Sequence, residues 1–537
     1  MKQFLIILSA LGMASCANVT SPTGGPKDTI PPTLKTSIPR QEQTNYKGSQ
    51  ILLEFDELMK LKNPKDEIII TPEIKDVKYT AKKKLVAIDL NEKLKDSTTY
   101  SIAFRESLQD LNEGNPAEDL HLAFSTGNII DSLSISGNVQ QLLKGLPAEK
   151  YTVALYQSDT FNLFKHKPVY FTRTNKLGNF KILNLKAGDY FIYTFEDKNK
   201  NLLLESKTEK FAFKPNRISL QAQQDSVQLK TIALDSRPIV IAGIRSLGHF
   251  TKVRFNKNLT SYSITSLDSM DRKIRHCFSS SQSEVDIFPT KPSTDSTLIR
   301  LIATDSLNQT NDSTFYVKQT NSKSLKEKIK IESARCQFIE TSQKLYAEFK
   351  VTELLKNIFP DSMYIMPDTI TRFAFKKGEI KYDTIFRKIS IEKTFEKKDS
   401  IKWKQAKLIL ATMAFTSIHG DSSRRTVLPI TYITPEETAT LIIEFPYEKS
   451  NTIVELLNEN YEPIAVVRQT KTLTLKNIKP STILLRAISD ENKNGVWDPG
   501  NPNSKILPEP VTFYKNQEGK RQIPLRANWE VNIKWNY

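Results

Sequence analysis

A loop near the C-terminus combines residue types and spacing that indicate cation chemistry. Oxygen-bearing side chains stand at loop positions 1, 3, 5 and 9, at Asp490, Asn492, Asn494 and Asp498. Gly495 at position 6 permits a tight turn, and alternate side chains of such a turn converge on one point, where a hard cation such as calcium finds oxygen ligands. Position 12 is Asn501 instead of the bidentate Glu of an EF-hand, and Glu509 from the following segment is the candidate that completes the shell. Two interpretations stay open: a weak calcium site, and a polar hairpin turn of residues that tolerate left-handed backbone.

Three other acidic stretches are weaker candidates. The loop from Asp197 to Glu205 has Leu202 where a glycine is wanted, so we expect a plain turn there rather than calcium. Asp110 begins a stretch whose acids lack alternate spacing, and we expect it to close a turn. The acids of the Glu54-Phe55-Asp56-Glu57 run could in principle supply a glycosidase pair, but a solvated strand end is the better interpretation.

The N-terminus indicates export and lipidation. Met1-Lys2-Gln3 is a short basic start, and residues 4–11 form an apolar stretch too short to span a bilayer permanently. The following residues end in Ala14-Ser15-Cys16, which resembles a bacterial lipobox. We therefore expect residues 1–15 to be a lipoprotein signal peptide, Cys16 to be acylated, and residues 16–33, rich in Pro and Gly, to be a tether.

Two further cysteines, Cys277 and Cys336, remain in the exported chain. A disulfide between them is permitted outside the cytoplasm, but large β domains do not require one, and we favour two separate buried thiols. The five histidines are isolated from one another, so no zinc-binding spacing occurs.

Composition narrows the classes of function further. Among 537 residues, 26% are charged, and no stretch after residue 16 approaches the ~18 apolar residues of a membrane-spanning helix. The net charge of +17 would favour nucleic acid in the cytoplasm, but an exported chain does not meet it there. In an exported protein, lysine runs such as residues 82–84 are either solvent-exposed faces or surfaces that attract anionic envelope material. No nucleophile elbow, metalloprotease helix motif or phosphate-binding loop occurs, so we expect a protein that is not an enzyme.

Short runs rich in β-branched and aromatic residues follow the tether, separated by turn residues at short intervals and with no long helical period. They include Ile51–Phe55, 67–71, 85–90, 99–104 and 121–124. Strands at this spacing predict an all-β chain of tandem β-sandwiches in an extended multi-domain arrangement.

The first part of this β sequence resembles a known family. The tether motif Pro22-Thr23-Gly24-Gly25-Pro26, the Glu54-Phe55-Asp56-Glu57 run, residues 98–100, residues 110–115 and the run Phe124-Ser125-Thr126-Gly127 occur in order. Together they are similar to the SbsA-type bacterial Ig-like domain of lipoproteins from the Bacteroidota. The resemblance implies an Ig-like domain over residues 34–127 in an envelope-anchored protein, and it carries over no catalytic residue.

The rest of the chain reads as further sandwiches. Residues 131–234 resemble the transthyretin-like, carboxypeptidase-regulatory type of β-sandwich, through Gly178-Asn179-Phe180 and the turn before Tyr190. The run from Tyr190 to Glu205 is echoed by residues 483–498, which predicts a second transthyretin-like unit at 438–537. The run Leu53-Glu54-Phe55 has a weaker echo in Ala347-Glu348-Phe349, so residues 236–330 and 331–437 are predicted to be two more sandwiches of Ig-like type.

These features favour a non-enzymatic, lipid-anchored protein of the outer membrane, at its periplasmic face or the cell surface, with a structural or binding role. The alternative is a carbohydrate- or protein-binding accessory lipoprotein of an uptake or secretion system. A hydrolase with an unrecognised site is the weakest interpretation. Expected partners are the membrane, through the lipid, and an envelope glycan or another envelope protein, but not nucleic acid.

Overall fold

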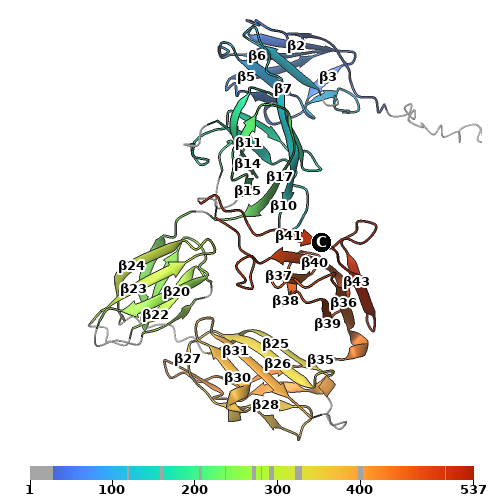
Figure 1. The fold of residues 1–537 in the computed structure, drawn as a ribbon. Coiled ribbons are helices and arrows are strands. Elements are labelled where there is room, and N and C mark those ends of the chain that lie inside the picture. Colours follow the sequence, from blue (N-terminus) through green and yellow to red (C-terminus); the bar gives the residue numbers. More distant parts are fainter. Residues whose placement is uncertain are drawn as a thin grey trace, which may run out of the picture. The chain divides into compact units, whose positions relative to one another are not determined.

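The structure is a computed structural model that describes residues 28–117, 120–157, 161–204, 209–235, 237–268, 274–279, 281–289, 295–320, 329–396, 403–501 and 504–537. The chain divides into two compact units, one of them made of the residues up to Val139 with 148–203 and 216–229, and the other made of the remaining segments. Regular structure is almost entirely β (Figure 1), in sheets of two to eight strands. Within the described ranges, no helix is long and apolar enough to cross a membrane.

The N-terminal sandwich, in the first unit, combines a four-stranded and a three-stranded sheet. The first has the order β1-β2-β6-β5, formed by β1 (Leu34–Ile38), β2 (Gln50–Phe55), β5 (Val77–Lys82) and β6 (Leu85–Leu90). The second has the order β4-β7-β9, formed by β4 (Ile69–Thr71), β7 (Thr99–Ala103) and β9 (His121–Ser125). A further pair is formed by β3 (Met59–Leu61) and β8 (Leu108–Asp110).

Strand alternation places the apolar residues of both sheets in one core. In β2, Ile51, Leu53 and Phe55 are buried while the residues at the two polar positions face solvent. They share a hydrophobic cluster with Ile102 of β7 and Phe124 of β9, which belong to the other sheet. This shared core defines a sandwich.

One predicted strand begins later than expected. The sequence predicts a strand from residue 67, but Glu67 ends a single helical turn, α2 (Pro64–Glu67), and β4 begins at Ile69. Pro64 at the first helical position has the φ angle that a helix requires, and Asn63 before it takes a left-handed backbone with φ 45°. The turn formed by Asn63 and Pro64 therefore delays the start of the strand by two residues, although the run is rich in β-branched residues.

The next strands belong to the segment 131–234. β11 (Thr152–Tyr156) pairs with β12 (Tyr170–Arg173) and β14 (Gly188–Phe195), and β14 also pairs with β16 (Ile218–Leu220). β10 (Leu133–Gln141) pairs with β13 (Asn179–Leu185), and β15 (Lys210–Phe213) pairs with the end of β17 (Gln224–Ala233). All five residues of β11 are buried, so both faces of this strand are covered.

In the second unit, the first sandwich packs the sheet β18-β19-β22-β21 against the sheet β20-β23-β24 around one core. The strands are β18 (Ile241–Leu247), β19 (Phe250–Phe255), β20 (Ser261–Ser266), β21 (Arg275–Phe278), β22 (Glu284–Phe288), β23 (Thr297–Thr304) and β24 (Thr310–Val317).

The following sandwich has a five-stranded sheet in the order β30-β31-β26-β25-β35. Its strands are β25 (Ile331–Ile339), β26 (Lys344–Val351), β30 (Ile380–Asp383), β31 (Lys388–Thr394) and β35 (Thr431–Ile433). It shares its core with the sheet β29-β28-β32-β34, formed by β28 (Met363–Met366), β29 (Phe373–Ala374), β32 (Lys407–Leu410) and β34 (Thr426–Pro429), while β27 (Leu355–Ile358) pairs with β33 (Phe415–Ser417). Short 3-10 turns are η2 (Pro360–Ser362), η3 (Lys377–Glu379) and η4 (Trp403–Gln405), and Trp403 stacks on Phe338 with 3.6 Å between ring centroids.

The last sandwich combines the sheet β39-β36-β43 with the sheet β38-β37-β40-β41, and β42 also pairs with β40. The strands are β36 (Ala439–Glu444), β37 (Thr452–Leu457), β38 (Pro463–Arg468), β39 (Thr472–Ile478), β40 (Ser481–Ser489), β41 (Val511–Phe513), β42 (Ile523–Leu525) and β43 (Glu530–Lys534), with the turn η5 (Pro435–Glu437) before them. Both sheets contribute to one core, so the prediction of an all-β chain of tandem sandwiches is confirmed.

Three sandwiches share one hydrogen-bonded clamp just before their first strand. In each, a backbone N–H donates to a side-chain oxygen that follows the second strand: Thr33 to Asp56 over 2.8 Å, Val240 to Asn256 over 3.0 Å, and Lys330 to Thr352 over 3.0 Å. A return bond runs from the backbone N–H of residue 56, 256 or 352 to the carbonyl of the same partner, over 3.1 Å in each case. The sandwiches that open with β1, β18 and β25 therefore begin in the same way.

This clamp corrects one sequence alignment. The echo placed Phe55 opposite Phe349, whereas the clamp makes Phe55 equivalent to Val351, the residue directly before Thr352. The alignment was therefore wrong by two residues. Strand alternation explains the error, since a shift of two keeps every apolar residue on the same face of its strand.

Candidate functional site

The predicted lipidation site, Cys16, lies outside the described residues, as do the signal peptide and most of the tether. The two other cysteines are described and buried, Cys277 on β21 and Cys336 on β25. Burial raises the pKa of the Cys277 thiol to about 12 and that of the Cys336 thiol to about 11. Both side chains therefore fill core positions as thiols, as the sequence predicted.

The predicted calcium loop begins where β40 ends and is organised around a fully buried carboxylate. Asp490 has an exposed fraction of 0%, and its two oxygens accept the backbone N–H groups of Asn494 (3.0 Å) and Gly495 (2.9 Å). Glu509 reaches the same loop from the chain before β41, accepting the N–H of Glu491 (2.8 Å) and of Asp498 (2.9 Å). The sequence offers Glu509 only as a candidate ligand from the next segment, and the structure places its carboxylate against this loop.

The remaining side chains of the loop converge on Asp498. The amide nitrogens of Asn492 and Asn494 donate to Asp498 Oδ2 over 2.5 Å and 2.8 Å, and Arg468 Nη1 lies 3.5 Å from Asp490 Oδ2. In the described part of the chain, no group of three or more His, Cys, Asp or Glu side chains is arranged to hold a metal ion. These internal hydrogen bonds are those of a polar turn. A cation would require both amides to rotate and present their oxygens instead, so calcium binding stays a prediction.

The loop at Asp197 repeats the hydrogen bonds at the start of this loop. The Asp197 oxygens accept the N–H groups of Asn201 (3.0 Å) and Leu202 (3.2 Å), at the same offsets as in the C-terminal loop. The sixth residue takes a positive φ in both loops, 62° at Leu202 and 86° at Gly495. A leucine pays a steric cost in this region that a glycine avoids, so the C-terminal loop is the less strained of the two.

The other acids singled out from the sequence hold strands and turns. Asp110 accepts three backbone N–H groups of its own loop, from residues 113, 114 and 115 at 2.7 to 3.0 Å, and so closes the predicted turn. Asp56 accepts both the N–H and the hydroxyl of Thr33 in the clamp, and these bonds lower the pKa of its carboxyl. Glu54 is exposed on β2.

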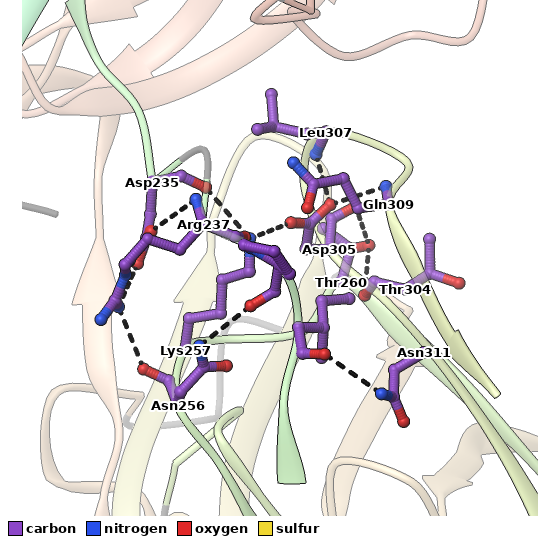
Figure 2. Close-up of polar contacts among 12 residues, drawn as sticks. Asp235, Arg237, Asn256, Lys257, Thr260, Thr304, Asp305, Leu307, Gln309 and Asn311 are labelled. Carbon is purple, nitrogen blue, oxygen red and sulfur yellow. Dashed lines mark hydrogen bonds and ion pairs between the residues drawn. The ribbon is translucent and has the colours of Figure 1, made fainter. Parts of the chain in front are cut away.

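A buried ion pair that sequence reasoning missed lies in the sandwich of residues 237–320 (Figure 2). The ammonium of Lys257 contacts the Asp305 carboxylate, and the side chains are only 6% and 2% exposed. Lys257 Nζ also donates to the carbonyls of Asp235, over 3.0 Å, and Arg237. Asp305 Oδ1 in turn accepts the N–H groups of Leu307 (2.8 Å) and residue 309 (2.9 Å).

This network has a structural role. Every donor of Lys257 meets an oxygen of the same sandwich or of the segment that enters it, and Asp305 holds its own turn. Figure 2 shows the Lys257 ammonium between the Asp305 carboxylate and the two carbonyl groups. Spacing in the sequence could not reveal this pair, because Asp305 lies 48 residues from Lys257.

A second feature missed from the sequence is a shallow polar groove of about 680 Å³ on the outer face of the sheet β30-β31-β26-β25. Strand alternation directs the apolar residues of these strands into the core and the polar ones outwards. The register places one row of polar residues across four strands, Arg335, Glu348, Ser390 and Lys381, and a second row beside it, Gln337, Tyr346 and Glu392. The groove is therefore lined by side chains of both charges, hydroxyl groups and one aromatic ring.

Comparison with known proteins finds one domain family over part of the chain and several distant solved structures. Residues 28–126 match the family model described as a bacterial Ig-like domain, which confirms the Ig-like resemblance over the first sandwich. No curated protein matches the chain.

Among solved structures, the Bacillus anthracis TIE protein is 10% identical, with 96% of this chain and 75% of that one covered and a TM-score of 0.13. BcpA, the major pilin subunit of Bacillus cereus, is 7% identical, with 75% and 98% covered and a TM-score of 0.13. TM-scores this low establish no shared domain arrangement and no function.

Proposed function

We propose that this chain is a non-enzymatic, lipid-anchored protein of the cell envelope whose β-sandwiches have a structural or binding role. The observation that supports it most is the Ig-like match over residues 28–126, on a sandwich whose clamp recurs at β18 and β25. In these sandwiches Asp56, Asp110 and Asp305 accept hydrogen bonds that hold strands and turns. Ig-like sandwiches are scaffolds on which binding surfaces are carried.

The anchoring part of the proposal rests on Cys16. The test is metabolic labelling with a palmitate analogue followed by separation of membranes from soluble material. Replacing Cys16 with Ser should abolish labelling and release the protein from membranes, whereas Cys336→Ala, which also removes one thiol, should change neither. A Cys16→Ser protein that is still labelled and still sediments would overturn lipid anchoring. Protease treatment of intact cells then distinguishes the cell surface from the periplasmic face.

The second candidate is an accessory lipoprotein that binds a carbohydrate or a protein for an uptake or secretion system. The polar groove favours it, because it sets an aromatic ring, Tyr346, among hydrogen-bonding side chains on a rigid sheet. A hydrolase is the weakest candidate. The groove carboxylates Glu348 and Glu392 each form an ion pair with a lysine, Lys388 and Lys344, as structural surface acids do.

A further inference from the structure

We propose that the outer face of the sheet β30-β31-β26-β25 binds an acidic polysaccharide, a chain of uronic acid sugars, laid across the strands. This inference rests on the second candidate function and assigns it a site and a ligand class. The site is the groove of about 680 Å³ described above.

The charges of the groove are unequally matched. Its three carboxylates are each held by a lysine: Glu348 by Lys388 at 2.7 Å, Glu392 by Lys344 at 2.6 Å, and Glu379 by Lys393 at 2.9 Å. Arg335 and Lys381 also line the groove, and neither is a member of an ion pair found in the described residues, although the charge of Lys381 helps to lower the pKa of Glu392. Two cations are therefore left to attract an anionic ligand.

The separation of these two cations indicates a long ligand. Arg335 on β25 is in register with Glu348 on β26, which is in register with Ser390 on β31, and Ser390 with Lys381 on β30. Three steps between neighbouring strands, at about 4.8 Å each, separate the backbone positions of the two cations by about 14 Å. Side chains that project straight out from the sheet at this separation do not meet on one small anion, whereas a polymer with repeated carboxylates contacts both.

The groups between the cations favour a sugar chain. Tyr346 lies in the neighbouring row between Gln337 and Glu392, and it is 38% exposed, so part of its ring is open to solvent. An exposed ring face offers apolar surface to the C–H face of a sugar. The amide of Gln337 and the hydroxyl of Ser390 exchange hydrogen bonds with sugar hydroxyls, and the Arg335 guanidinium pairs with a carboxylate through two parallel N–H donors.

The test measures binding of the whole chain from residue 17 onward, which retains every described residue, to immobilised polygalacturonate at low and moderate salt. The double variant Arg335→Ala/Lys381→Ala should weaken binding at least about tenfold, because each of its two substitutions removes a hydrogen bond to a charged group. The matched control is Lys78→Ala/Lys82→Ala, which removes two exposed lysines from β5 and should leave binding unchanged. Tyr346→Ala should weaken binding and Tyr346→Phe should restore it, since the ring is what contacts the sugar.

Three outcomes would overturn the proposal. One is wild-type binding by the Arg335→Ala/Lys381→Ala protein, and another is an equal loss in the Lys78→Ala/Lys82→Ala control. The third is equally tight binding of single-stranded DNA through the same residues, since that would reduce the groove to non-specific charge attraction. Neutral dextran should not bind. The binding assay uses protein without the lipid anchor, so a negative binding result does not change the outcome of the Cys16 labelling test. Conversely, a negative labelling result does not prevent binding at the groove from being measured.

Discussion

The buried pair Lys257–Asp305 gives the strongest test of how these sandwiches are held together. Replacing Lys257 with Met keeps most of the side-chain volume but leaves the Asp305 carboxylate, which is 2% exposed, without its cation. Removing one partner of a buried ion pair costs about 3 to 5 kcal/mol, because the other charge stays desolvated and uncompensated. The carbonyls of Asp235 and Arg237 lose a donor as well. The two N–H groups that Asp305 retains offset part of this cost.

Hydrogen exchange with mass spectrometry is the suitable assay, because a chain of several sandwiches does not unfold in one two-state step. A loss of about 3 to 5 kcal/mol accelerates exchange in β23 and β19 by a hundredfold to several thousandfold. Peptides from the last sandwich, at β36, should not change. The control is Arg300→Ala, which breaks an ion pair with Asp312 in the same sandwich whose side chains are 51% and 45% exposed. Solvent screens that pair, so its loss should have a much smaller effect.

A double variant separates the pair from simple loss of packing. Lys257→Met/Asp305→Asn removes both charges and should recover part of the protection lost in Lys257→Met, because no uncompensated charge remains. The reasoning would be refuted if Lys257→Met exchanged no faster than Arg300→Ala. It would also be refuted if the double variant were as destabilised as the sum of its two single variants.

Further predictions concern single groups. Cys277 and Cys336 should resist maleimide labelling in the native chain and react fully in denaturant, because burial raises the pKa of both thiols, and fast native labelling would contradict their placement. At Asp110, burial raises the pKa of the carboxyl, but three backbone N–H groups lower this pKa by more, so that it lies below its usual value. A carboxyl whose pKa is lower in the folded state than in the unfolded state stabilises the fold above the unfolded-state pKa, and this stabilisation is lost as the pH falls through the folded-state pKa. The wild-type melting temperature should therefore fall between about pH 6 and about pH 3, and Asp110→Asn should make this fall smaller. If the Asp490 loop binds calcium, the ion at 100 times its Kd should stabilise the last sandwich by about 2.7 kcal/mol. The melting of this sandwich can be followed by Trp497 fluorescence, and Asp490→Ala should abolish the increase in melting temperature that calcium causes. Identical melting curves in calcium and in chelator would show that the loop is only a polar turn.

Local patterns carried the successful sequence predictions. The strand β2 and the two Asp loops follow from alternation and from turn residues within a few positions of each other, so they can be read without knowing the fold. Glu509 is only a candidate from the sequence, because its approach to the loop depends on how the chain returns between residues 498 and 509. What escaped prediction depends on register between strands far apart in sequence. Arg335 and Lys381 meet one groove only because three strand pairings align, and Lys257 finds Asp305 across 48 residues.

The three clamped sandwiches show how one scaffold accepts different chemistry. Directly after the clamp residue, the first sandwich has Glu57 and the one at β18 has Lys257, and the turn acids Asp110 and Asp305 each accept N–H groups of their own loop. At Glu57, burial and the neighbouring carboxylates, Asp110 among them, raise the pKa of the side chain. At Lys257 the opposite charge closes a buried pair with Asp305. The backbone bonds of the clamp and the turn therefore occur with either charge at the following position, a half-buried glutamate at Glu57 and a buried lysine at Lys257.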